Sequence, residues 1–208
     1  MKTLTKEMQK SLTPQKAIEL LQEGNKRFVN NLKMNRNLLQ QVNETSSGQY
    51  PLAVVLSCID SRTSAELIFD QGLGDIFSVR IAGNIVNEDI LGSMEFACKV
   101  AGAKAVVVLG HSKCGAVKGA CDHVEMGNLT NLPSKLQPAV HAEKTITTDR
   151  SSANDDFVEK VASLNVKIAM HQIHEKSTIL NDMIAQGEIA LIGGMYDVET
   201  GLVDFYKD

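Results

Sequence analysis

Apolar residues along this chain form short continuous runs, separated by segments with helical periodicity. The strongest runs cover 52–56 and 105–109, where valine, leucine and alanine follow one another without alternation. Such runs are typical of strands in a parallel sheet that helices cover on both faces. Weaker runs at 75–81 and 189–192 predict two further strands, and alternation over 202–206 predicts the edge strand of a hairpin.

The segments between these runs predict helices and one long loop. Thr13 and Pro14 form a helix start signal, a capping hydroxyl followed by proline at the first helical position. Apolar spacing over 90–100 predicts a crossover helix, and the pattern over 158–185 predicts a long helix. Residues 40–50, rich in Asn, Ser, Thr and Gly, are expected to form a loop.

This order of elements predicts an α/β fold with a mainly parallel central sheet of four strands plus an antiparallel edge strand, flanked by helices. The N-terminal helix has no crossover role, so N-terminal helices are expected to pack on a partner subunit. The length of 208 residues suits a single domain, 1–208, with a helical arm over 1–48 and an α/β core over 49–208.

Composition and charge indicate which partners, location and cysteine chemistry to expect. The net charge of −4 gives no reason to expect nucleic acid or an anionic membrane surface as a partner. The first residues lack the apolar core of a signal peptide and no apolar run is long enough to cross a bilayer, so a cytoplasmic protein is expected. Four cysteines are too few for a disulfide framework and are more typical of metal ligands or buried thiols.

Side chains with metal-binding chemistry follow two of the predicted strands. Cys58 comes after the first run, and His111 and Cys114 follow the run at 105–109. Because the carboxyl ends of parallel strands meet at one edge of a sheet, these side chains are expected to converge. A catalytic zinc site has three protein ligands and an open position, so this set favours catalysis over a closed structural site. The alternative is that both cysteines are ordinary buried thiols and His111 is a loop histidine.

Asp60 and Arg62 occupy alternate positions beyond Cys58, so both side chains can point to the same side of an extended segment. Arginine can hold a carboxylate with two parallel hydrogen bonds, which lowers the pKa of the acid and fixes its orientation. Beside a zinc-bound hydroxide, such a carboxylate would accept a hydrogen bond from the hydroxide and aim the hydroxide's lone pair. The alternative is a structural ion pair at a strand end.

Three segments resemble one known family. The string CIDSR at 58–62 and the string GHSKCGAVKGA at 110–120 resemble the signature of the β-class carbonic anhydrases, and SVRIAGN at 78–84 resembles the same family. The resemblance implies reversible hydration of CO2 to bicarbonate and a proton by a zinc lyase. The zinc ligands and orienting pair that it implies are Cys58, His111 and Cys114, with Asp60 and Arg62. It also implies that Asp60 can become a fourth zinc ligand in a closed state.

The same resemblance, to the plant-type members in particular, supplies expectations for the substrate pocket. The pocket residues implied are Gln49, Phe77, Ala82, Phe96 and Gly115. Gln49 would donate to a substrate oxygen, and Phe77 and Ala82 would form apolar walls. Phe96 stands where plant-type members usually have tyrosine. The regulated bacterial members bind inhibitory bicarbonate with a tryptophan, which this sequence lacks, so that regulation is not expected.

The resemblance further implies a homodimer or a larger homo-oligomer. Helices from Pro14 onward would wrap the partner, and Gln49 and Phe77 would reach the neighbouring site. Two alternatives stay open from the sequence. One is hydrolysis of a CO2 analogue such as CS2 or COS on the same scaffold, and the other is a non-catalytic oligomer that zinc stabilises. The open fourth position and the Asp60/Arg62 pair argue against the second.

Overall fold

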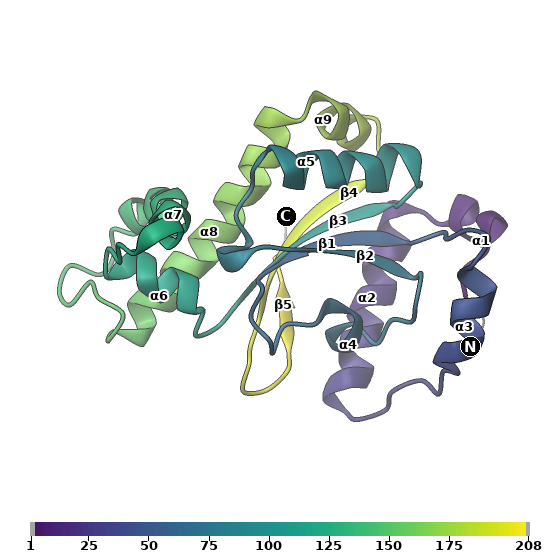
Figure 1. Cartoon of the computed structure of the whole chain (residues 1–208), viewed down its shortest axis with the longest axis horizontal. Coiled ribbons are helices and arrows are strands. Elements are labelled where there is room, and N and C mark those ends of the chain that lie inside the picture. The colour runs from purple at the N-terminus through teal and green to yellow at the C-terminus, as the bar shows by residue number, and fades with distance from the viewer. Residues whose placement is uncertain (1–2, 207–208) are drawn as a thin grey trace.

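A five-stranded sheet forms the centre of the computed structural model, which describes residues 3–206 (Figure 1). The strands are β1 (Ala53–Ser57), β2 (Ile76–Arg80), β3 (Ala105–His111), β4 (Ala190–Tyr196) and β5 (Val203–Phe205). Their order in the sheet is β2-β1-β3-β4-β5, with β1 to β4 parallel and β5 antiparallel to β4. The predicted sheet of four parallel strands and an antiparallel edge strand is therefore confirmed.

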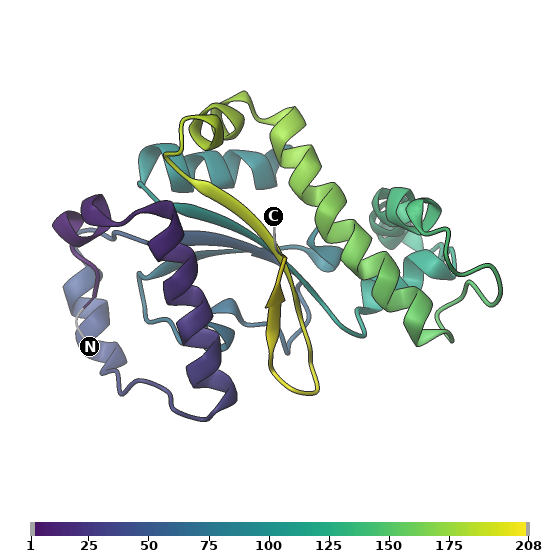
Figure 2. The ribbon, with the colours of Figure 1, turned by 180° about the vertical axis from the view of Figure 1, so that it is seen from behind.

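Helices cover both faces of this sheet. The described α-helices are α1 (Lys6–Ser11), α2 (Pro14–Val29), α3 (Leu38–Thr45), α4 (Ala65–Ile68), α5 (Glu88–Glu95), α6 (Gly115–Cys121), α7 (Asn131–Ala142), α8 (Asp155–Lys176) and α9 (Thr178–Ala185). Two short 3₁₀ helices, η1 (Ala82–Asn84) and η3 (Gly127–Thr130), and a π-helical turn, η2 (Phe96–Val100), complete the described elements. Figures 1 and 2 show α5, α8 and α9 on one face and α2 and α4 on the other.

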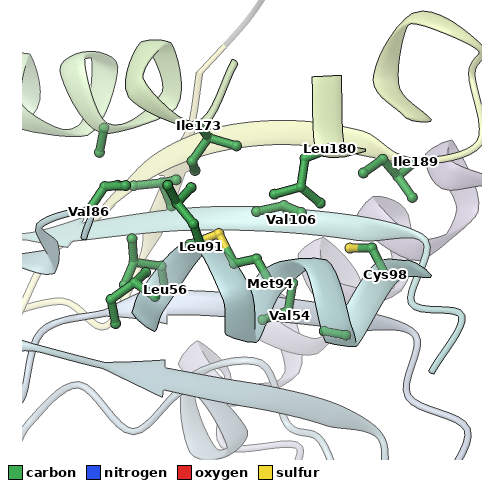
Figure 3. Packing of buried hydrophobic residues seen from close by; sticks show 14 of the residues in the cluster. Val54, Leu56, Val86, Leu91, Met94, Cys98, Val106, Ile173, Leu180 and Ile189 are labelled. Atoms are coloured by element: carbon green, nitrogen blue, oxygen red, sulfur yellow. The ribbon is translucent and has the colours of Figure 1, made fainter. Parts of the chain in front are cut away.

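Alternate residues of the central strands serve two separate cores. Val54 and Leu56 of β1 point toward α5, α8 and α9, where Met94 and Ile173 are fully buried against them (Figure 3). Val55, one position along, packs on the opposite face with residues of α2 and α4. Every residue of β1 and β3 is buried. This explains why the two runs are apolar at every position rather than at alternate ones.

Two regions differ from the sequence prediction. Residues 40–50 were expected to form a loop, yet α3 spans Leu38–Thr45, because the Asn37 side chain accepts the Gln40 N–H and caps the helix. The long helix expected over 158–185 is broken at Ser177, whose hydroxyl accepts the Leu180 N–H and starts α9. In both cases a local capping bond decides the structure. Within residues 3–206, no helix combines the length and the apolar character that membrane crossing requires.

The N-terminal helices contribute to the core of this same chain. Ala17 and Leu21 of α2 are fully buried against the sheet. On α1, the Gln9 side chain donates to the carbonyl oxygens of Pro51 and Ala101 at 2.7 and 2.8 Å. The apolar face of α2 therefore covers this chain's own sheet. Contact between a partner and the other faces of these helices stays a prediction, as does the division into arm and core.

A buried network of ion pairs connects α2 and the segment that follows it to Asp70, two residues after α4. The Asp70 carboxylate, 3% exposed, accepts from Arg27 Nε at 2.6 Å and from Arg36 Nη1 at 2.5 Å. We expect Asp70→Asn to lower the free energy of unfolding by about 3 kcal/mol, because it leaves the buried Arg36 guanidinium without its counter-charge. Asparagine tolerates the left-handed backbone of this residue, φ 45°, so the charge is the main change. Urea unfolding at neutral pH measures the difference.

The pH dependence of the difference in unfolding free energy between the wild type and Asp70→Asn shows whether the difference comes from the Asp70 charge. Burial alone would raise the pKa of Asp70, but hydrogen bonds from Arg27 and Arg36 outweigh burial and hold the pKa below its ordinary value. A lowered pKa stabilises the fold above the unfolded-state pKa of about 3.9, and this stabilisation is lost as the pH falls further. The wild type and Asp70→Asn should therefore converge below about pH 4. Glu19→Gln, which removes an exposed pair with Lys16, should change stability by less than about 0.5 kcal/mol.

Candidate metal centre

The metal-binding side chains meet at the point where the order of the strands in the sheet reverses. From β1 the chain continues to β2 on one side, while β3 lies on the other side of β1. Ligand sites of parallel sheets lie at such switch points, beyond the carboxyl ends of the strands. Cys58 directly follows β1, His111 is the last residue of β3, and Cys114 directly precedes α6. Their ligand atoms lie within 4.8 Å of one another, and the three residues are between 1% and 4% exposed.

The His111 ring is oriented as a metal ligand would be. Its Nδ1 lies 2.8 Å from the Ser112 carbonyl oxygen. A carbonyl oxygen can only accept, so Nδ1 carries the proton and Nε2 keeps a free lone pair. Nε2 is buried and has no hydrogen-bond partner among the described residues. A buried polar atom without a partner is costly, and a cation between this nitrogen and the two sulfurs would satisfy it.

The two thiols contact each other, and each changes the pKa of the other. A hydrogen bond from Cys114 lowers the pKa of Cys58 to about 4, and the Gly83 N–H acts in the same direction. That contact with Cys58, together with burial, raises the pKa of Cys114. One negative charge is therefore readily formed in this buried group, and a divalent cation would favour loss of the second proton.

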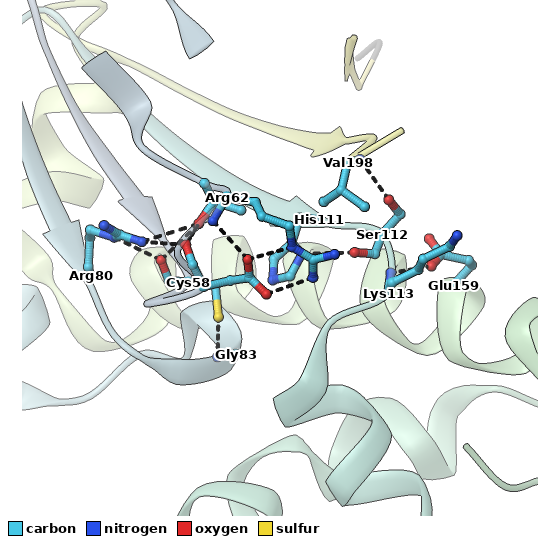
Figure 4. Close-up of polar contacts among 11 residues, drawn as sticks. Cys58, Arg62, Arg80, Gly83, His111, Ser112, Lys113, Glu159 and Val198 are labelled. Carbon is cyan, nitrogen blue, oxygen red and sulfur yellow. Dashed lines mark hydrogen bonds and ion pairs between the residues drawn. The ribbon is translucent and has the colours of Figure 1, made fainter. Parts of the chain in front are cut away.

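Asp60 lies two residues after Cys58, and the Arg62 side chain, labelled in Figure 4, holds its carboxylate. The Arg62 side chain donates to both carboxylate oxygens, from Nε at 2.9 Å and from Nη2 at 2.8 Å. The Arg62 backbone N–H adds a third bond at 3.0 Å. These bonds, above all those from the guanidinium, hold the pKa of Asp60 well below its ordinary value. Asp60 is thus an ionised carboxylate of fixed orientation, paired with Arg62.

Comparison with known proteins assigns the chain to a family. The carbonic anhydrase family model matches residues 53–203, well over half of the chain. The chain belongs to the carbonic anhydrase family. Carbonic anhydrase 2 of Mycobacterium tuberculosis is 36% identical over 196 residues, which cover 90% of each chain. The carbonic anhydrase of Mycolicibacterium smegmatis is 32% identical, with 92% of each chain covered.

Solved structures place this carbonic anhydrase in the β class. The β-carbonic anhydrase CafA of Aspergillus fumigatus has a TM-score of 0.69 and 27% identity to this chain, with 81% of each chain covered. The resemblance noted in the sequence is therefore confirmed at the level of family and fold.

Two residues that sequence reasoning did not single out shape the loop after β1 in this carbonic anhydrase. Arg80, at the end of β2, donates to the carbonyl oxygens of Cys58 and Asp60 at 2.9 and 2.6 Å. Gly83 donates its N–H to Cys58 Sγ at 3.4 Å. Gly83 has φ 69°, a backbone conformation that favours glycine, and a Cβ there would come within 2.9 Å of the Leu136 side chain, which would have to shift. Both residues lie inside the SVRIAGN string, which was the available signal.

The expected pocket residues divide into two groups. Ala82 begins η1 next to Gly83, and Gly115 directly follows Cys114, so both adjoin the metal-binding group. Gln49 precedes β1 and therefore lies at the opposite end of that strand from Cys58. Phe77 and Phe96 contact each other edge to face, 6.3 Å between ring centroids, and Phe96 is 54% exposed.

Phe77 pairs with Val54, which places it well before the carboxyl end of the sheet. Within one chain, Gln49, Phe77 and Phe96 are therefore not brought to the metal-binding group. Phe77 and Phe96 instead line a surface cavity of about 640 Å³. Any part they play in the pocket would have to be at a site on another copy of the chain.

Proposed function

We propose that this carbonic anhydrase catalyses the reversible hydration of CO2 at a Zn²⁺ ion held by Cys58, His111 and Cys114. The observation that supports the proposal is the convergence of two thiols and a free imidazole nitrogen beside a carboxylate that arginine orients. Thiolate and imidazole ligands suit zinc, and three of them leave a position for water. When bound, zinc lowers the pKa of a coordinated water to roughly 7.

Asp60 would orient the nucleophile. Its carboxylate is ionised and can only accept hydrogen bonds, so it selects a nucleophile that donates a hydrogen bond to it. That bond directs a lone pair of the nucleophile toward CO2. Arg62 keeps the carboxylate in place through two hydrogen bonds. An Asp60 carboxylate held in this way would not act as a fourth zinc ligand. In the net reaction, a water oxygen bonds to the carbon of CO2 and one proton is released to solvent.

A homodimer, or a larger assembly built from it, would complete the pocket. Gln49 and the Phe77–Phe96 pair lie apart from the metal-binding group of their own chain, and Phe96 is half exposed. We propose that these residues face the metal-binding group of a neighbouring copy. There Gln49 would donate to a substrate oxygen as negative charge develops, and the two rings would form an apolar wall. A cytoplasmic location stays a prediction.

Replacing Gln49 by alanine is expected to lower kcat/KM for CO2 about tenfold, the usual effect of losing one hydrogen bond. Zinc content should not change. Co-purified heterodimers of a Gln49→Ala chain and a Cys58→Ser chain then show which site Gln49 serves. If it serves the neighbouring copy, the intact metal group of the first chain receives Gln49 from the second, and each heterodimer regains one wild-type site. Activity at the level of Gln49→Ala alone, or below, would assign Gln49 to its own chain.

The proposed reaction is tested by stopped-flow CO2 hydration across pH, with zinc measured on the same sample. We expect about one zinc per chain and turnover that rises through a basic pKa. Bound zinc without CO2 hydration at any pH would contradict the proposal. In that case, hydrolysis of CS2 or COS would indicate a CO2-analogue hydrolase, and no turnover of any of the three would indicate a non-catalytic zinc-stabilised oligomer.

A further inference from the structure

The backbone of Lys113 has an unusual conformation at a sensitive position. Lys113 lies between His111 and Cys114, and its φ of 55° is in the left-handed region that residues other than glycine rarely adopt. The dihedral angles of Lys113 help to set how the His111 ring and the Cys114 sulfur stand relative to each other. The lysine side chain itself does not favour this conformation, so neighbouring groups must hold it.

A carboxylate from a distant helix meets this backbone. The Lys113 N–H donates to Glu159 Oε1 at 2.8 Å (Figure 4). Glu159 lies in the second turn of α8, directly after Phe157 and Val158, both of which are fully buried in the core beside α6 and α7. The carboxylate is therefore carried by a rigid element rather than by a loop, and a charge-assisted bond of this length is strong.

The neighbouring residue Ser112 is held by a different part of the fold. Its N–H donates to the Tyr196 carbonyl oxygen at 2.9 Å, and its hydroxyl accepts the Val198 N–H at 2.9 Å. The Lys113 side chain pairs with Glu199 on the same hairpin, but both side chains are largely exposed. The β4–β5 hairpin thus fixes Ser112, while α8 fixes the peptide of Lys113.

We infer that Glu159 is a positioning residue for the metal centre. By holding the Lys113 N–H, its carboxylate keeps residue 113 in the left-handed conformation, in which His111 Nε2 and Cys114 Sγ face the same point. Glu159 is not one of the proposed metal ligands, and it acts through the backbone between two of them. This inference rests on the proposed zinc ligands, and partners one step removed from metal ligands commonly affect metal affinity strongly.

Zinc release from the purified holoenzyme to a colorimetric chelator tests the inference without an activity assay. Glu159→Ala should release zinc about 10- to 100-fold faster than the wild type, because residue 113 is no longer held. Glu159→Asp keeps the charge but withdraws it by one methylene, so it should also release zinc faster. Glu159→Gln keeps an acceptor oxygen at the same reach and should stay within about threefold of the wild type. Glu199→Gln is the matched control and should match the wild type.

Thermal unfolding of the zinc-free proteins separates positioning from a general loss of stability. For zinc-free Glu159→Ala and Glu159→Asp, we expect melting temperatures within about 3 °C of the zinc-free wild type. Unchanged zinc release in both variants would overturn the inference, as would equal acceleration by Glu199→Gln. Faster zinc release that is fully accounted for by a lower melting temperature of the zinc-free variant would also overturn the inference. A wild type that binds no zinc would instead contradict the proposed metal site itself.

Discussion

Replacing Cys58 by serine is expected to abolish both zinc retention and CO2 hydration. A serine hydroxyl stays protonated near neutral pH and binds zinc poorly, so only His111 and Cys114 would remain of the three converging ligands. Elemental analysis of the purified variant should find far less than one zinc per chain, and stopped-flow hydration should fall to the uncatalysed rate. Full zinc content together with full activity would remove Cys58 from the ligand set.

Cys98→Ser is the matched control for this result. Cys98 is another buried thiol, but it packs among the apolar residues between α5 and the sheet. Burial raises the pKa of Cys98 to about 12. Among the described residues, Cys98 does not belong to the converging Cys58, His111 and Cys114 group, so it is not expected to hold the metal. The serine variant should keep its zinc and activity, and lose about 1–3 kcal/mol of unfolding free energy because a hydroxyl enters an apolar core.

Replacing Arg62 by alanine is expected to lower turnover about 10²-fold while leaving zinc bound, since a catalytic group that loses its orientation typically costs a factor of this size. Arg62 does not belong to the converging Cys58, His111 and Cys114 group, but it supplies two of the bonds that hold Asp60. The freed carboxylate can rotate away from the nucleophile or toward the metal. Zinc analysis and stopped-flow hydration on one sample measure both effects.

Two further variants show whether orientation or charge matters. Arg62→Lys keeps the positive charge but cannot form the paired bonds of a guanidinium, so its turnover should fall between the wild type and Arg62→Ala. Asp60→Asn removes the ionised acceptor and should be at least as impaired as Arg62→Ala, again with zinc retained. Wild-type turnover in Arg62→Ala would reduce the Asp60–Arg62 pair to a structural ion pair at a strand end.

The parts of the fold that could be predicted from sequence are those with the densest apolar patterns. The apolar runs before Cys58 and His111 are buried on both faces of the sheet, so they predicted central parallel strands. The ends of these strands predicted the sheet edge where Cys58 and His111 meet. The break at Ser177 and the helix that follows Asn37 could not be read from periodicity. Each depends on one capping bond, which the pattern of apolar residues does not record.

The candidate site was predictable for residues that carry their chemistry in short motifs. Asp60 and Arg62 are two positions apart, so their pairing is a local event. Glu159 is 46 residues from Lys113, and only the packing of α8 brings them together. The pocket role of Gln49 was assigned by resemblance alone, and the fold of one chain places it away from the metal-binding group. Contacts that depend on tertiary or quaternary packing leave no signal in local sequence.

We propose that CO2 hydration depends on a zinc ion at Cys58, His111 and Cys114. Preparing the zinc-free protein, adding zinc in steps and following CO2 hydration by stopped flow measures this dependence. We predict that activity rises linearly and stops rising at about one zinc per chain. Hydration that survives zinc removal, or that stays at the uncatalysed rate once one equivalent has bound, would contradict the account.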